Sequence, residues 1–246
     1  IESSSEFAIR HFIVKYEKET MKKMLTYAQS KNEHLRRYAS EGCRPRLPWA
    51  IALPAFKKDP SAVLKVLELL KYDESKYVQK SVANNLNDIS KDNPSLVINF
   101  VAKNIGKNKN CDWILKHASR TLLKQGNQEV LSLFGFVKSS HIRLTSFSVD
   151  STVFFGDELH FEFVLNSEKL LGNLRIEYAI DFMKANGSLT RKVFMISQSD
   201  IKKTNKSITK KHSFKPITTR KYYKGKHCLA IIINGVEFIK KEFDLI

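Results

Sequence analysis

The chain has 246 residues, of which 42% are hydrophobic and 27% charged, and its 42 Lys and Arg against 25 Asp and Glu give a formal charge of +17. This balance is that of a folded globular protein and excludes a chain disordered throughout, a collagen and a disulfide-rich miniprotein. Three scattered cysteines suit neither a disulfide framework nor a zinc site, so we expect a reducing compartment, no metal and no cofactor. No apolar run reaches the ~20 residues of a membrane span, so we expect no membrane partner.

Residues 1–135 are predicted to be helical. Apolar residues recur at intervals of three and four in the runs 63–70 and 78–89. Asp59-Pro60 and Asp92-Asn93-Pro94 are typical helix starts, and Gly126-Asn127 is a typical helix end. The pattern therefore indicates a series of short helices joined by tight turns.

An internal repeat lies within this helical half. Three segments resemble one another: 35–40, 78–83 and 114–119. Each has an aliphatic residue, a basic residue two positions later and a small residue soon after, so that Arg37, Lys80 and Lys116 occupy one equivalent position. This spacing predicts HEAT-like helix pairs, which stack into a solenoid with one helix per repeat on its concave face.

A second row of polar residues follows the repeated basic position by one helical turn. Glu41 stands four residues after Arg37, Asn84 after Lys80, and Arg120 after Lys116. One interpretation is a basic concave surface with a few carboxylates set into it. The other, equally compatible, is a solvated helix face on which Glu41 forms an exposed ion pair.

Residues 142–246 are predicted to form strands. Apolar and polar residues alternate over 159–165 and 174–182, and Asn186-Gly187 and Asn234-Gly235 are strong hairpin signals. About seven strands in this length suit an immunoglobulin-like sandwich. The predicted fold is thus a HEAT-like α-helical solenoid over residues 1–138, followed by an Ig-like β-sandwich over residues 139–246.

Both halves are basic. Residues 1–140 carry 24 basic and 14 acidic side chains, and residues 141–246 carry 18 and 11. Ten of the basic residues lie between Lys202 and Lys226, in a stretch without any Asp or Glu. A polyanionic partner such as nucleic acid is the default explanation. A solvated loop with a protected sheet edge is the alternative for this stretch, and we favour contact with phosphates.

Three segments carry a family resemblance: 32–50 (NEHLRRYASEGCRPRLPWA), 76–91 (KYVQKSVANNLNDISK) and 113–118 (WILKHA). They closely resemble the AlkC branch of the bacterial DNA alkylation repair family, which comprises HEAT-like-repeat DNA glycosylases and adds an Ig-like C-terminal domain. Members carry further N-terminal residues, and this chain begins at Ile1 without an initiator Met. We therefore expect the helical domain to lack its N-terminal part.

The resemblance implies hydrolysis of the N-glycosidic bond of cationic alkylated bases, such as 3-methyladenine and, in this branch, 3-methylcytosine. Such a base leaves as a neutral molecule, so carboxylates are needed to stabilise an oxocarbenium-like sugar and to position water. The family's acids match Glu41 and Asp88 and, through a short Ser5-Glu6-Phe7 segment, Glu6. Its aromatic residue matches Trp49, which without the resemblance reads as a core anchor; Trp113 is expected in the core.

The implied partner is double-stranded DNA containing alkylated bases, bound by a cytoplasmic, nucleoid-associated monomer. The resemblance also implies a shallow catalytic face without a deep base pocket, and the helical repeats show no aromatic cluster. The alternative function is a non-catalytic HEAT-like protein that recognises bent or branched DNA by shape, and a protein-interaction scaffold is a weaker third option. The candidate DNA contacts are Arg37, Arg44, Arg46, Lys80, Lys116, Arg120, Lys210, Lys211 and Lys221.

Overall fold

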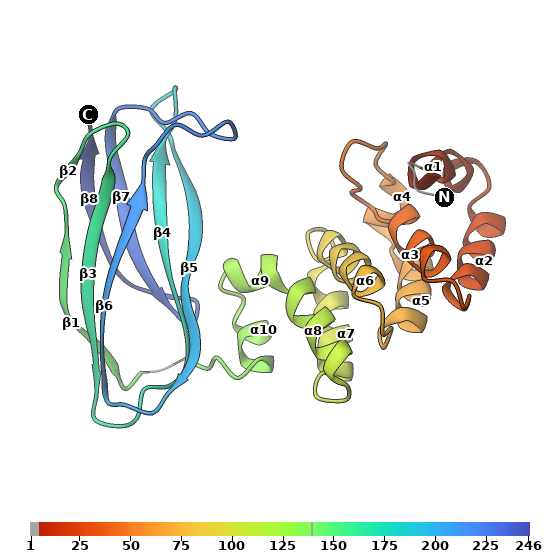
Figure 1. Ribbon diagram of the computed structural model, residues 1–246, viewed down its shortest axis with the longest axis horizontal. Coiled ribbons are helices and arrows are strands. Elements are labelled where there is room, and N and C mark those ends of the chain that lie inside the picture. Colours follow the sequence, from red (N-terminus) through yellow and green to blue (C-terminus); the bar gives the residue numbers. More distant parts are fainter. Residues whose placement is uncertain (1–4, 139) are drawn as a thin grey trace. The chain divides into compact units, whose positions relative to one another are not determined.

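The computed structural model describes residues 5–138 and 140–246. Its contacts divide the chain into two compact units, residues 1–125 and 126–246 (Figure 1). The first unit is helical, and the second consists almost entirely of strands. This confirms the predicted order of a helical solenoid followed by an Ig-like β-sandwich.

The helices of the first unit form two rows. One row is α1, α3, α6 and α8, each in contact with the next; α2, α5 and α7 pack against this row. The helices are α1 (Ser5–Lys15), α2 (Glu17–Ala28), α3 (Glu33–Gly42), α4 (Pro54–Lys58), α5 (Ser61–Leu70), α6 (Lys76–Ile89), α7 (Pro94–Asn104), α8 (Lys109–Ala118) and α9 (Arg120–Lys124). One helix of each predicted repeat, α3, α6 and α8, thus lies in the same row.

The middle helix of this row, α6, is buried on two sides. Val78, Val82 and Leu86 form its apolar side and are inaccessible to solvent. Its buried polar residues face the neighbouring helices: Asn85 Nδ2 donates to the carbonyl of Ser40 on α3 at 2.8 Å. Because buried polar groups are stable only when paired, this seam of hydrogen bonds fixes α6 against α3.

The second unit contains two sheets. Their strand orders are β1-β3-β6 and β2-β8-β7-β4-β5, antiparallel throughout except for β2 and β8. The strands are β1 (Ile142–Val149), β2 (Thr152–Val153), β3 (Glu158–Ser167), β4 (Gly172–Met183), β5 (Leu189–Ile201), β6 (Asn205–Ser213), β7 (Gly225–Ile233) and β8 (Val236–Leu245). The alternating apolar residues predicted for β3 and β4 form the core between the sheets.

A short helix, α10 (Gln128–Leu133), belongs by its contacts to the second unit. Asn234 Nδ2, in the β7–β8 turn, donates to the carbonyl of Val137 at 2.8 Å, and Asn173 Nδ2 on β4 donates to the carbonyl of Gly135 at 3.2 Å. The contact boundary therefore falls after Gln125, whereas the domain boundary predicted from the sequence lies between residues 138 and 139. Helical character does not reveal which unit a helix packs against.

None of the described helices is long and apolar enough to cross a lipid bilayer.

Candidate active site

Two buried carboxylates are joined by one arginine at the ends of α3 and α6. Arg44 Nη1 donates to Glu41 Oε1 at 2.6 Å, and Arg44 Nε donates to Asp88 Oδ2 at 2.9 Å. Glu41 and Asp88 are only 7% and 3% exposed, and Arg44 is 7% exposed. Residues 44 positions apart in the sequence thus form a single ionic group, and α3 packed against α6 brings them together.

Further donors fix each carboxylate. Ser81 Oγ donates to Glu41 Oε2 at 2.6 Å, and Lys91 Nζ donates to Asp88 Oδ1 at 3.1 Å. Burial lowers the pKa of Arg44, but the charges of Glu41 and Asp88 outweigh it, so the pKa of this guanidinium is raised. Arg44 therefore stays a cation between the two carboxylates.

The third predicted acid joins the same group through a second arginine. Arg37 Nη1 donates to Glu6 Oε1 at 2.5 Å, and Arg37 Nη2 lies 4.0 Å from Glu41 Oε1. Opposite charges therefore alternate along five residues drawn from three neighbouring segments. We call this set the ion-pair chain: Glu6, Arg37, Glu41, Arg44 and Asp88.

Trp49 lies in the loop that follows α3 and is 96% exposed. Its φ of +58° is in the left-handed region, which is strained for a bulky side chain. The loop is closed by a hydrogen bond from Leu53 N to the carbonyl of Pro45 at 3.1 Å. The core-anchor interpretation is thus wrong for Trp49: an indole held in solvent on a strained backbone is available to a ligand.

The predicted phosphate-contacting residues of the helical unit fall into two groups. Lys80 and Lys116 are exposed, and Arg120 is partly buried with Nη2 donating to Asn84 Oδ1 at 3.0 Å. Arg44 is different: it is buried and already bonded to two carboxylates, so its contact with DNA stays a prediction that its present partners do not favour. Arg46 is partly exposed but forms two hydrogen bonds with Asp92, at 2.6 and 3.0 Å.

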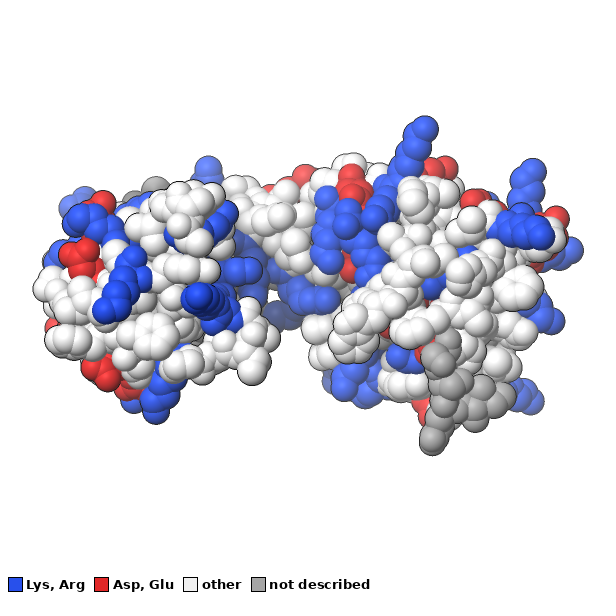
Figure 2. Space-filling model, turned by 90° about the horizontal axis from the view of Figure 1, so that it is seen from above, with Lys and Arg blue, Asp and Glu red and all other residues white. Residues whose placement is uncertain are grey.

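The candidate contacts of the β unit do not share one surface. Lys210 and Lys211 are consecutive residues of β6, so their side chains point to opposite faces of the sheet. Lys211 Nζ donates to Glu158 Oε2 at 2.7 Å, and Lys221 Nζ lies 5.5 Å from the centre of the Tyr223 ring. Basic side chains are visible on both units in Figure 2.

A pocket of about 790 Å³ lies beside Glu6 and Arg37 in the helical unit. Its walls include Tyr27 and Tyr38, which contact each other edge to face, and Tyr77, over whose ring the Arg37 guanidinium lies at 4.4 Å. The expectation that the helical repeats hold no aromatic cluster is therefore wrong. These tyrosines come from three helices, and only the fold brings them together.

Trp113 also differs from its prediction. It is partly exposed rather than a core residue, it stacks on His117 with ring centroids 5.2 Å apart, and Lys76 Nζ lies 5.2 Å from its ring.

Among the described residues, no group of three or more His, Cys, Asp or Glu is arranged to hold a metal ion.

Comparisons with known proteins match both units. The family model described as "DNA alkylation repair enzyme" matches residues 1–122, and the model of the C-terminal Ig-like domain of the uncharacterised protein YhaZ matches residues 143–246. The uncharacterised protein YhaZ of Bacillus subtilis is 48% identical over 235 residues, which cover 95% of this chain and 66% of that protein.

A solved structure is similar over almost the whole chain. It is the Pseudomonas fluorescens alkylpurine DNA glycosylase AlkC bound to DNA containing an abasic site analogue, with 37% sequence identity and a TM-score of 0.95. The match covers 99% of this chain and 69% of that chain. The chain thus spans about two thirds of the length of the relatives it matches.

Proposed function

The chain belongs to the DNA alkylation repair enzyme family, and on that premise we propose that it is a DNA glycosylase acting on cationic alkylated bases in double-stranded DNA. The observation that carries the proposal is the ion-pair chain. It brings together the three carboxylates Glu6, Glu41 and Asp88. Arg44, which bonds to two of them, stands at the start of the loop that exposes Trp49.

The proposed reaction is hydrolysis of the bond between C1′ of the sugar and the ring nitrogen of the base. The bonding electron pair leaves with the base and neutralises its positive charge, so the base needs no proton from the enzyme. The oxygen of water then bonds to C1′, and a carboxylate accepts the proton that this water releases. Asp88 and Glu41 are proposed to stabilise the positive sugar and to orient the water.

Arg44 is proposed to hold these two carboxylates in place. Its guanidinium bonds to both, so neither is free to rotate away from the position that faces a bound sugar. The exposed indole of Trp49 is proposed to press on the sugar or on the cationic base, a contact worth about 0.5–2 kcal/mol. Substrates proposed for this site are 3-methyladenine and 3-methylcytosine.

DNA is proposed to lie against the exposed basic residues of the helical unit, Lys80 and Lys116, with Arg37 and Arg120 beside them. Lys210 and Lys221 are proposed as phosphate contacts of the β unit, which gives the protein a second, tethered surface for the same polyanion. The similar AlkC structure contains bound DNA, which supports DNA as the partner. We propose that the protein acts as a monomer on nucleoid DNA in the cytoplasm.

The alternative is a DNA-binding protein without catalytic activity. Carboxylates weaken binding to phosphates, so a pure binder gains nothing from three of them gathered beside its basic residues. The test is incubation of the purified chain with methylated DNA, followed by chromatography of the released bases. Free methylated base above the no-enzyme control supports the glycosylase; tight DNA binding without any release supports the alternative.

A further inference from the structure

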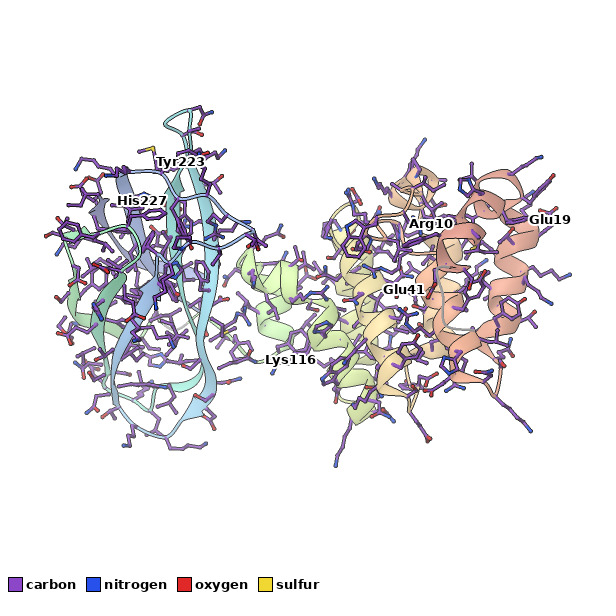
Figure 3. All side chains as sticks on the ribbon, turned by 45° about the horizontal axis from the view of Figure 1, so that its top comes forward. Arg10, Glu19, Glu41, Lys116, Tyr223 and His227 are labelled. Atoms are coloured by element: carbon purple, nitrogen blue, oxygen red, sulfur yellow. The ribbon has the colours of Figure 1, made fainter. Side chains whose placement is uncertain are left out.

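Arg10 on α1 is a fully buried cation whose described hydrogen-bond partners are all backbone carbonyls. Its Nε donates to the carbonyl of Ile51 at 2.6 Å, and its Nη1 donates to those of Gly42 and Arg44 at 3.1 and 2.8 Å. The side chain is inaccessible to solvent, and its Nη2 has no hydrogen-bond partner among the described residues. Figure 3 labels Arg10 and Glu41, which lie on the contacting helices α1 and α3.

Such an arrangement is costly for stability. Desolvation lowers the pKa of Arg10 although Glu41 and Asp88 are close enough to raise it, and both of these carboxylates pair with Arg44 instead. Burying a cation without a paired anion is unfavourable. An apolar side chain of similar size would avoid that cost, but it would leave the carbonyls of Gly42, Arg44 and Ile51 without this donor. A structural role in packing alone therefore does not explain an arginine at this position.

The three carbonyls show what Arg10 holds. Gly42 is the last residue of α3, and helix ends leave carbonyls without intrahelical donors, so a guanidinium there satisfies groups that need a partner. Ile51 lies at the other end of the loop, two residues after Trp49. Arg10 thus ties together the start and the end of the segment that carries the strained, exposed indole.

Close packing of α1 on α3 makes this reach possible. A Cβ atom added to Gly42 would lie 2.8 Å from Cγ2 of Ile9, the residue before Arg10. Any larger residue at position 42 would therefore require Ile9 to shift, and the absence of a side chain there lets α1 come this near to the end of α3.

We infer that Arg10 is a positioning residue, which fixes the Trp49 loop relative to Glu41 and Arg44 so that the indole and the carboxylates act on the same nucleotide. The inference rests on the proposed function. Arg10 touches no reacting atom, and it acts through the backbone of residues 42–51.

The experiment combines a conformational and a kinetic measurement. The chain has two tryptophans, so a Trp113→Phe background leaves Trp49 as the only one, and its fluorescence anisotropy reports how firmly the loop is held. In this background we expect Arg10→Gln to lower the anisotropy and to slow single-turnover base release at least tenfold. Arg10→Lys, which keeps the charge but offers fewer fixed donors, should give a smaller change in the same direction.

The matched control is Arg36→Gln. Arg36 also donates to two backbone carbonyls, those of Ser30 and Lys31, and it pairs with Asp73, but it lies at the other end of α3. This variant should leave the anisotropy and the rate at parental values.

A second readout is the double variant that combines Arg10→Lys with Trp49→Ala. Its fold-loss in the rate of base release should be smaller than the product of the two single fold-losses, because both substitutions act through one loop.

If Arg10→Gln does not fold by circular dichroism, Arg10→Lys decides the question. Parental anisotropy in a folded Arg10 variant, or fully multiplicative losses in the double variant, would overturn the inference. A parental chain that releases no base refutes the proposed function instead, and the anisotropy measurement still tests whether Arg10 holds the loop.

Discussion

Replacing Asp88 by Asn tests the ion-pair chain most directly. The substitution keeps the shape of a side chain that is 3% exposed and removes one negative charge. Because that charge is proposed to stabilise the positive sugar only in the transition state, base release should fall by ~10²-fold or more, or about 2.7 kcal/mol. Affinity for DNA should stay the same or increase, since a charge that repels phosphates is lost.

The contacts of Asp88 also limit how far Asp88→Asn can lower the free energy of unfolding. Asp88 accepts hydrogen bonds from Arg44 and Lys91, and removing one partner of a buried pair costs about 3–5 kcal/mol when its charge is left unpaired. Asn keeps an acceptor oxygen and Glu41 still pairs with Arg44, so we expect a loss at or below the lower end of that range. The protein should therefore remain folded in the assay.

Asp92→Asn is the matched control. Asp92 lies four residues further on, pairs with Arg46 in a partly exposed position and is not part of the ion-pair chain. It changes the net charge equally, so its effect measures the general influence of one carboxylate near DNA. The assay is single-turnover release of methylated base with DNA affinity measured in parallel. A parental rate for Asp88→Asn, or an equal loss for Asp92→Asn, refutes the assignment.

Exposure, charge and burial lead to three further predictions. Trp49→Ala should slow base release by about 2–30-fold, the equivalent of 0.5–2 kcal/mol. The melting temperature should stay near the parental value, because the indole is 96% exposed and alanine keeps the same backbone requirement. Lys80→Gln should lower the slope of log affinity against log salt by about one, whereas Lys211→Gln, whose partner is Glu158, should change it less; equal slopes for both would place the DNA elsewhere. Burial lowers the pKa of His212 to about 4 from 6.5, so stability that is present above pH 6.5 is lost as the pH falls towards 4. We expect His212 to account for about 1–2 kcal/mol of that loss after allowance for its partly solvated ring. Urea unfolding at pH 7 and pH 5 should show a loss of stability that His212→Phe reduces; burial also lowers the pKa of His117 and His227, so part of the loss should remain.

Much of the fold follows from periodicity, and part of the site does not. Alternation with periods of 3.6 and 2 predicts both units, because each element buries one face. The string around Glu41 and Trp49 identifies the family. Burial of Arg44 could not be predicted, because its second partner, Asp88, is 44 residues away and depends on how α3 packs against α6. Trp49 is expected in the core because it is a large apolar residue, and its exposure in a loop with a left-handed backbone at this position could not be read from the sequence.

The ion-pair chain crosses two helix interfaces, from α1 to α3 and from α3 to α6. In a repeat protein, each interface between neighbouring repeats contributes its own increment to stability, and neighbouring repeats can separate before either one unfolds. Parting of α3 from α6 would divide Asp88 from Arg44 while both helices stay intact. The ion-pair chain therefore forms only while neighbouring repeats stay packed together. Its presence depends on the free energy of the interfaces between repeats more than on the stability of any one helix.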